Sequence, residues 1–548
     1  MRGLFSAIKI VCLLSLKLNS QRKTINMKNK LNLIFSVFFI GLLHFSGFAQ
    51  LNSAQVDSVV EKTMKTFNVP GMAVAVIKDG EIIIENTYGI QSVETKKPVN
   101  KQTLFGVASN TKAFTSAALA QLIDEGKLEW DTKVTDIIPG FKLYDAYVTS
   151  EFTVRDLLVH RSGLGLGAGD LMVIPASNTT TLEEMIHNLR YLKPVSSFRT
   201  KYDYDNLLYV VAGEIVARVS GESYDEYIEN NFFKPLGMTR SLLNIEEIEK
   251  DQNRIDGHAP VDGKLQITPP TFTQISTPAA GIYASIEDMS KWVKARINYG
   301  RYGENLKDSL FSKKQAKEMW TAQTLTPTAK GDYNTNFSAY ALGWVVKDVK
   351  GHLEVSHTGG LFGIVSQVTI IPELELGIIV LTNQESGAAF MSVTNSIKDA
   401  YLGVKGKDRI DQYYQNRLKA EKRADSITQK VAQEIEKQLK NKSQGLPEKD
   451  IVGEYKDDWF GKVKIEKNKK GKLRFEAEKS PELIGEVSFY KGTTYVVRWD
   501  NASFNADAYI NFDLDTEGKA KGFSMKAISP LTDFSFDFHD LDFKRVNN

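Results

Sequence analysis

Cysteine is almost absent from this chain of 548 residues. The single cysteine, Cys12, lies in a leader-like segment at the start of the chain, so a mature chain without that segment contains none. Disulfide bonds, a thiolate nucleophile and a cysteine zinc site are therefore excluded for the mature protein. The same absence leaves no cysteine to carry a lipid at the expected cleavage point.

The chain also lacks a bias toward one sign of charge. Lysine and arginine number 69 against 67 aspartate and glutamate residues, and this balance predicts neither a nucleic-acid partner nor an acidic surface as partner. Hydrophobic residues make up 42% of the chain, which is enough for a sizeable core and argues against general disorder. The length predicts more than one domain.

Long apolar runs are missing too, and the most apolar stretch falls within residues 1–49. There a basic segment that begins at Met27 precedes a short apolar run over 33–43, and small residues follow up to Ala49. This order is typical of a secretory signal, so we expect cleavage after Ala49 and a native start at either Met1 or Met27. The run is short for a membrane span, and an uncleaved anchor is the alternative. We expect a periplasmic or secreted protein with no stable membrane span after cleavage.

Strand-like segments lie near both ends of the region that follows. A helix is predicted over 54–67, and an Asp79-Gly80 turn joins two strands that begin at Met72. Further strands and a closing helix are predicted much later, over 342–347, 352–360, 364–372, 376–383 and 387–401. We therefore predict an α/β (α+β) fold, in which one antiparallel sheet flanked by helices unites both ends of the domain. The intervening chain forms a helical lobe, and the cleft between lobe and sheet is the expected site.

The composition of the chain changes twice more toward its end. Over 405–449, lysine, glutamate, aspartate and glutamine alternate densely with scattered aliphatic residues, as in a charged helix or linker. Over 450–548, short segments alternate apolar and polar residues between turns, which predicts a small all-β domain of barrel type. The main domain is accordingly expected over 50–404.

The segment 106–126 is predicted to be the central helix of the lobe, with apolar residues at helical spacing and a glycine at its end. Ser109 and Lys112 share one face at its start. There the amine can approach the hydroxyl, and free backbone N–H groups point at whatever the serine attacks. This arrangement suits a serine nucleophile. A solvated lysine on a core helix is the alternative, because the same spacing recurs at Ser6, Ser20 and Ser488.

Two other segments place polar residues beside predicted helices. His160 falls in a short helix that ends in a glycine-rich loop, within 153–169, and we interpret it as a structural histidine that fastens this loop. Tyr204 and Asn206 lie just before or at the N-terminus of the next helix. Tyrosines in such places usually serve packing, so packing and catalysis both remain open for Tyr204 on the local pattern alone.

Three motifs in order resemble those of the serine beta-lactamase and penicillin-binding-protein superfamily. They are Ser109-Asn-Thr-Lys112, Tyr204-Asp-Asn206 and His357-Thr-Gly359, and they are most similar to the class C-like branch of esterases, D-aminopeptidases, DD-peptidases and beta-lactamases. Framing segments over 153–164, 235–238, 279–292 and 371–383 are similar as well, so the resemblance spans about 54–401. The terminal β domain more weakly resembles the lipocalin-like module of some members.

The resemblance implies roles for the residues of these motifs. Ser109 would form an acyl-enzyme, with Lys112 or Tyr204 as the general base and His357 nearby; these groups titrate together, so the sequence does not name one base. Tyr202 is an alternative candidate for the tyrosine of the second motif, although only Tyr204 has an asparagine two residues later in the sequence. No metal and no cofactor are implied. Asn206 is expected to orient Lys112 and a substrate amide. Thr358 and Gly359 are expected to bind substrate. The backbone N–H groups of Ser109 and Gly360 are expected to form an oxyanion hole.

His357 is the departure from the pattern, because many penicillin-recognising members carry a lysine there. A lysine is a permanent cation that grips a substrate carboxylate, whereas histidine is largely neutral at pH 7. We therefore expect an exported serine hydrolase that acts on an ester or on a D-amino-acid-containing peptide or amide. A true beta-lactamase is one alternative. A non-catalytic protein that binds penicillin or cell-wall fragments is the other, and the expected partner is in each case a small molecule.

Overall fold

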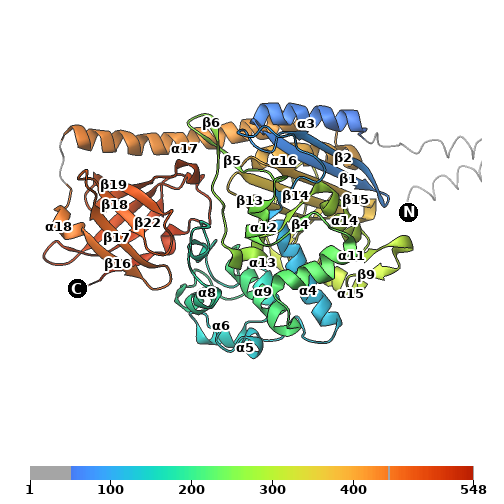
Figure 1. The fold of residues 1–548 in the computed structure, drawn as a ribbon, viewed down its shortest axis with the longest axis horizontal. Helices are drawn as coiled ribbons and strands as arrows, with labels where there is room; N and C mark the ends of the chain where they lie inside the picture. Colours follow the sequence, from blue (N-terminus) through green and yellow to red (C-terminus); the bar gives the residue numbers. More distant parts are fainter. Residues whose placement is uncertain (1–50, 442–444, 547–548) are drawn as a thin grey trace, which may run out of the picture. The chain divides into compact units, whose positions relative to one another are not determined.

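The computed structural model describes residues 51–441 and 445–546 of the chain (Figure 1). The expected leader, residues 1–49, lies outside the described residues. Within the described ranges no helix combines the length and the apolar character that a membrane crossing requires.

One eight-stranded antiparallel sheet unites the two ends of the main domain, as predicted. Its strand order is β10-β11-β12-β13-β14-β15-β1-β2, so β1 lies between its hairpin partner β2 and the late strand β15. The strands are β1 (Gly71–Lys78), β2 (Glu81–Gly89), β10 (Thr324–Leu325), β11 (Ser338–Tyr340), β12 (Val345–Val349), β13 (His352–Leu361), β14 (Ile364–Ile371) and β15 (Leu376–Thr382).

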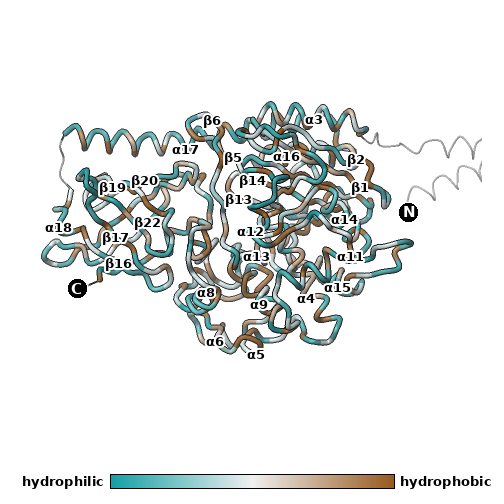
Figure 2. Tube along the Cα trace, viewed as in Figure 1, coloured by the Kyte–Doolittle hydropathy of each residue, from teal (hydrophilic) through white to brown (hydrophobic). Residues whose placement is uncertain are grey.

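Helices cover both faces of this sheet, which explains why its central strands β14 and β15 are buried on both faces rather than on alternate residues. Every residue of β14 and β15 is buried. On one face, Val74 and Val76 of β1 pack with helices α3 (Ser53–Phe67) and α16 (Gly387–Leu402). The opposite face packs against α14 (Ile286–Ile297) and the helical lobe. Figure 2 shows the apolar residues gathered in this interior.

The lobe is built around the predicted helix at 106–126. That segment begins as a 3₁₀ turn, η1 (Ala108–Thr111), and continues as α4 (Lys112–Asp124), of which ten residues are buried. Next to α4 lie α9 (Leu207–Ser220) and the short α13 (Thr277–Ala280). A largely buried helix therefore places Lys112 inside the core, with Ser109 in the turn directly before it.

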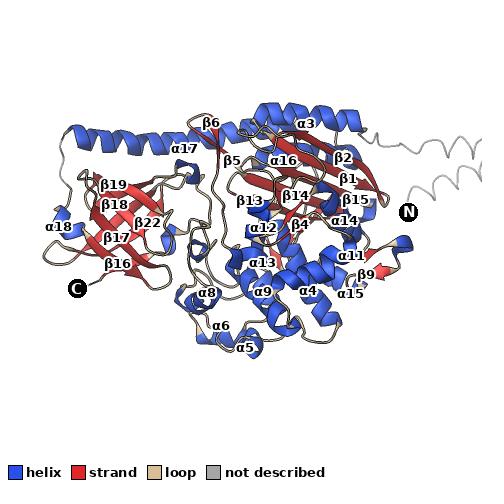
Figure 3. Ribbon diagram, in the orientation of Figure 1, coloured by secondary structure: helices blue, strands red, loops and turns tan. Residues whose placement is uncertain are grey.

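A single long helix, α17 (Arg409–Lys440), occupies most of the charged segment predicted over 405–449. Val431 and Ile435 on this helix pack against Val496 and Ile528 of the terminal domain. That domain is a closed antiparallel barrel, as the period-two pattern predicted (Figure 3). Its strands are β16 (Gly453–Asp457), β17 (Gly461–Lys467), β18 (Leu473–Ala477), β19 (Ile484–Lys491), β20 (Thr494–Trp499), β21 (Ala508–Leu514), β22 (Ala520–Ala527) and β23 (Asp542–Arg545).

Candidate active site

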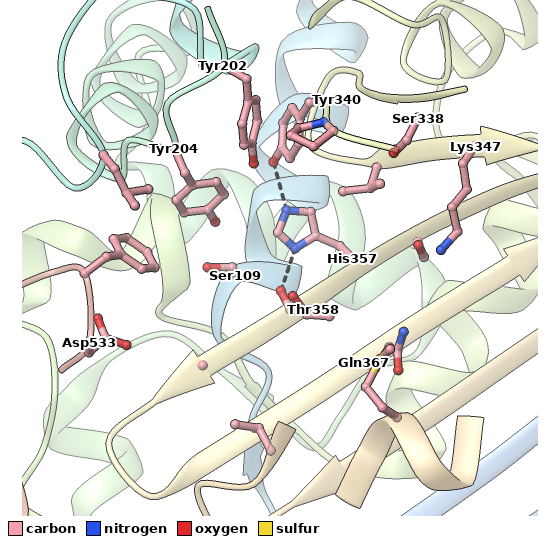
Figure 4. Close-up of a pocket in the computed structure, with 18 of the residues that line it drawn as sticks. Ser109, Tyr202, Tyr204, Ser338, Tyr340, Lys347, His357, Thr358, Gln367 and Asp533 are labelled. Carbon is pink, nitrogen blue, oxygen red and sulfur yellow. Dashed lines mark hydrogen bonds between the residues drawn. The ribbon is translucent and has the colours of Figure 1, made fainter. Parts of the chain in front are cut away.

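Ser109 lies in the η1 turn, immediately before α4 and beside strand β13 (Figure 4). The residue before it, Ala108, has a positive φ of 51°, a conformation that costs an L-residue free energy and that recurs at functional sites. On the other side, a Cβ at Gly359 would lie 2.4 Å from the carbonyl oxygen of Val107 and 2.8 Å from the Cβ of Ala108. Glycine at 359 is therefore what allows β13 to pack directly against the Ser109 turn.

Lys112 contacts Ser109 directly, as the i, i+3 spacing predicted. Its Nζ lies 3.1 Å from Ser109 Oγ, 2.7 Å from Asn206 Oδ1 and 3.0 Å from the carbonyl oxygen of Ala279. The last two atoms are acceptors only, so Nζ donates a hydrogen to each of them. A neutral amine has two hydrogens and one lone pair, and in this geometry the lone pair faces the Ser109 hydroxyl.

The environment of Lys112 favours that neutral form. The side chain is fully buried, and burial lowers the pKa of Lys112 to about 7, against the opposing effect of the Asp170 and Asp205 carboxylates. An amine with a pKa near the working pH is well suited to take a proton. The geometry and the electrostatics thus both suit Lys112 to accept a proton from Ser109.

Asn206 holds the lysine, which is the role that the resemblance implied for it. Its Nδ2 donates to Asp170 Oδ2 at 2.7 Å, and this bond fixes the amide so that Oδ1 faces Lys112. Asp170 is fully buried in the glycine-rich loop, and burial raises its pKa to about 8, with Asp205 adding to the rise. Sequence analysis missed Asp170, because nothing in the local pattern distinguishes it from an ordinary loop aspartate.

Tyr204 lies over the same amine, with Lys112 Nζ 4.8 Å from the ring centroid. Its buried hydroxyl has no hydrogen-bond partner among the described residues. Burial raises the pKa of Tyr204 well above its ordinary value, although the nearby Ser109 hydroxyl lowers it in part. A phenol of this kind stays protonated near neutral pH, so Tyr204 supplies no base there, whereas the pKa of Lys112 lies close to 7. Tyr202, the alternative candidate for the tyrosine of the second motif, points into the same cavity (Figure 4).

His357 is neutral and hydrogen-bonded through both ring nitrogens. Nδ1 lies 2.6 Å from the carbonyl oxygen of Thr358, which can only accept, so Nδ1 carries the proton. Nε2 then accepts from the hydroxyl of Tyr340 at 2.8 Å. Burial and, second, the charge of Lys112 lower the pKa of His357 to about 3. The ring therefore lines the cavity without a cation and without a free nitrogen.

His160 has structural contacts, as interpreted, but its ring bonds to the segment before α9 rather than to the expected glycine-rich loop. Its Nδ1 accepts the backbone N–H of Asp205 at 3.1 Å, and its ring lies against Tyr204 with the centroids 4.1 Å apart. Burial lowers the pKa of His160 well below the ordinary value. The histidine thus fastens the segment that carries Tyr204 and Asn206.

The two residues of the expected oxyanion hole, Ser109 and Gly360, border the same cavity. Pairing between β12 and β13 ends at Val345 and Ser356, so the β13 residues that follow have no strand on that side. Gly360 faces open space, since a Cβ there would meet no atom within 4 Å. Gly360, Thr358 and Ser109 line one cavity of about 870 Å³. Side chains of the barrel domain also line it, including Phe534 and Ser535, which sequence analysis did not associate with the site.

The fold and this site define the class to which the chain belongs. The family model of the Beta-lactamase family matches residues 56–401, and the chain belongs to this family. A second model, Domain of unknown function (DUF3471), matches residues 437–545 and so covers the barrel.

Individual relatives share the main domain. Unguisins hydrolase ungD of Aspergillus violaceofuscus (strain CBS 115571) is 27% identical over 373 residues, which are 64% of this chain and 65% of that protein. Protein flp of Staphylococcus aureus (strain MRSA252) is 30% identical over 341 residues, 61% of this chain and 63% of that protein. The chain thus spans slightly less than two thirds of the length of these relatives. The octameric penicillin-binding protein homologue from Pyrococcus abyssi shares the fold, with a TM-score of 0.58 and 22% identity over 90% of this chain and 100% of that chain.

Proposed function

We propose that this protein is an exported serine hydrolase that acts through an acyl-enzyme on Ser109, with an ester or a D-amino-acid-containing peptide or amide as substrate. The observation that carries the proposal is the 3.1 Å contact between Ser109 Oγ and the buried amine of Lys112, whose pKa is lowered to about 7. Membership of the Beta-lactamase family and the name of a hydrolase relative support it.

In the proposed reaction, Ser109 Oγ attacks the substrate carbonyl carbon while its proton passes to Lys112 Nζ. The carbonyl π electrons move onto oxygen, and the backbone N–H groups of Ser109 and Gly360 stabilise that oxyanion. When the carbonyl re-forms, the bond to the leaving group breaks. The protonated phenol of Tyr204 then relays a proton: it gives one to the leaving group as it recovers one from Lys112 Nζ. Water then attacks the acyl-enzyme by the same route and releases the acid.

The first test is covalent labelling of the mature protein with a fluorophosphonate probe. Ser109→Ala is expected to abolish both labelling and hydrolysis, because it removes the hydroxyl that the buried amine of Lys112 contacts. The matched control is Ser488→Ala, which removes the serine of the same Ser-x-x-Lys spacing on barrel strand β19 and is expected to change nothing. Undiminished labelling of the Ser109 variant contradicts the proposal.

The second test concerns the substrate class. His357 supplies no cation at the position where many penicillin-recognising members carry lysine, and its pKa of about 3 keeps it neutral at any working pH. A panel of short-chain esters, paired D- and L-aminoacyl amides and a chromogenic cephalosporin separates the alternatives. We expect turnover of an ester or a D-aminoacyl amide, with at most slow acylation by the cephalosporin. Efficient cephalosporin turnover would instead identify a beta-lactamase.

A further inference from the structure

A segment of the barrel domain reaches the active site of the main domain. It lies between strands β22 and β23, and its residues Asp533, Phe534 and Ser535 line the same cavity as Ser109. The Phe534 ring meets the Tyr204 ring edge to face, with the centroids 5.7 Å apart and the planes at 80°. Asp533 lies across the cavity from the catalytic motifs (Figure 4).

Ser535 makes the contact that concerns the reacting groups. Its Oγ donates to Asp170 Oδ2 at 2.8 Å, the same oxygen that accepts the Asn206 amide at 2.7 Å. Both ends of the bond are removed from solvent, since Asp170 is 0% and Ser535 4% exposed. A continuous chain of hydrogen bonds thus runs from the barrel through Asp170 and Asn206 to Lys112.

Asp537, two residues farther along the chain, binds the loop that carries Asp170 through two hydrogen bonds. Its carboxyl group accepts the backbone N–H groups of Gly169 at 2.6 Å and Leu171 at 3.3 Å, which flank Asp170 on either side. The loop also lies close to the segment at Gly167, where a Cβ would come within 2.6 Å of the carbonyl oxygen of Phe534. The position of the Asp170 carboxylate is therefore set by the barrel domain as well as by its own loop.

We propose that Ser535 of the barrel domain is a positioning residue for catalysis, which holds the Asp170 carboxylate so that Asn206 presents its oxygen to the Lys112 amine. This inference rests on the proposed function. It assigns the appended domain a part in the chemistry, although no barrel side chain has to touch the reacting atoms.

The electrostatics of the chain give the proposal a measurable consequence. Asp170 faces Lys112, Asp205 and Asp537, and Lys112 faces the Tyr204, Tyr209, His160 and His357 rings besides the two aspartates. Burial raises the pKa of Asp170, and the hydrogen bonds from Asn206 and Ser535 oppose that rise. In its ionised form, Asp170 in turn raises the pKa of Lys112. Loss of the Ser535 hydroxyl therefore favours neutral Asp170 and lowers the pKa of Lys112.

The experiment measures the rate of fluorophosphonate labelling between pH 5 and 9 in the full mature chain. In a plot of labelling rate against pH, the rate falls on the acid side where Lys112 becomes protonated, and we call this part of the profile the acid limb. For Ser535→Ala we expect the acid limb to move to lower pH by at least about 0.3 unit. The plateau rate should fall about three- to tenfold, as for the loss of one ordinary buried hydrogen bond. Ser535→Thr keeps the hydroxyl and is expected to retain the wild-type profile.

Ser480→Ala is the matched control, because Ser480 is a buried barrel serine whose hydroxyl has no partner among the described residues. It should leave both limb and plateau unchanged. Thermal unfolding of each variant is measured first, and Ser535→Cys, which keeps the size with a weaker donor, takes the place of Ser535→Ala if the latter does not fold.

A double-mutant cycle with Asp170→Asn then tests the route. If Ser535 acts through Asp170, its replacement has no further effect in the Asp170→Asn background. Additive losses, or a Ser535→Ala profile equal to wild type in a protein whose Ser109 is labelled, overturn the inference while the proposed function stands. A wild-type protein that is not labelled at all defeats the proposed function itself.

Discussion

The proposed acylation of Ser109 is expected to depend on pH through the state of one buried amine, that of Lys112. Burial lowers the pKa of Lys112 from 10.5 to about 7, so at pH 7 about half of the molecules carry the neutral base. An unshifted lysine would be neutral in only about one molecule in three thousand, so the shift is equivalent to roughly a thousandfold in available base. The labelling rate is therefore expected to rise with pH, to level off above about 7, and to fall about tenfold for each pH unit below it.

Two variants test whether the fall of the labelling rate below pH 7 reflects protonation of Lys112. Lys112→Met fills the space without a base and should lose about a hundredfold or more in rate, with the limb abolished. Asp205→Asn removes a carboxylate that raises the pKa of Lys112, so the limb should move to lower pH. The histidines are not expected to contribute, because the pKa of His357 is near 3. A flat profile from pH 5 to 9 in the wild type, or a limb that Asp205→Asn moves upward, would refute the reasoning.

Further expectations concern the sheet. Gly359→Ala should cost about 1–3 kcal/mol of stability and most of the activity, because its Cβ would meet a backbone carbonyl at 2.4 Å that cannot yield. Gly360→Ala, which enters open space, should leave the Tm unchanged; equal Tm values for the two variants would disprove the steric argument. Lys398→Met should cost about 3 kcal/mol, since Lys398 pairs with the fully buried Glu354 at 2.8 Å. Burial alone would raise the pKa of Glu354, yet its lysine partners lower it to about 2. The contribution of ionised Glu354 to the free energy of unfolding is therefore complete above pH 4.5 and is lost as the pH falls toward 2. A chemical-denaturation series between pH 2 and 7 in wild type and Lys398→Met checks both statements.

The architecture of the main domain was predictable because its signals are local. Apolar runs, the Asp79-Gly80 turn and the period-two alternation of the terminal domain each depend on neighbours in sequence, and the corresponding strands are confirmed. The Ser109 and Lys112 contact was also predictable, because a helical turn brings residues three apart together. The one local refinement is that a 3₁₀ turn, not the α-helix itself, holds Ser109.

The support of the site was not predictable, because its partners are distant in sequence. Asp170 and Ser535 are separated by 365 residues, and neither belongs to a motif. Tyr340, which binds His357, is likewise an isolated tyrosine in a short strand. Burial is what gives such residues their importance, and burial is a property of the assembled chain.

The place of β1 in the sheet also constrains the order in which this protein can assemble. The backbone N–H of Gly71 donates to the Asn383 side chain across a separation of 312 residues, and β1 pairs with β15 from Met72 to Lys78. Closing a loop of that size is slow and gains nothing until the last strands exist. During synthesis from the N-terminus, the apolar hairpin of β1 and β2 must therefore wait, unpaired on one edge, until nearly the entire domain has emerged. Such a nascent chain is exposed to aggregation during this interval, and a holding chaperone is the kind of factor that it would need.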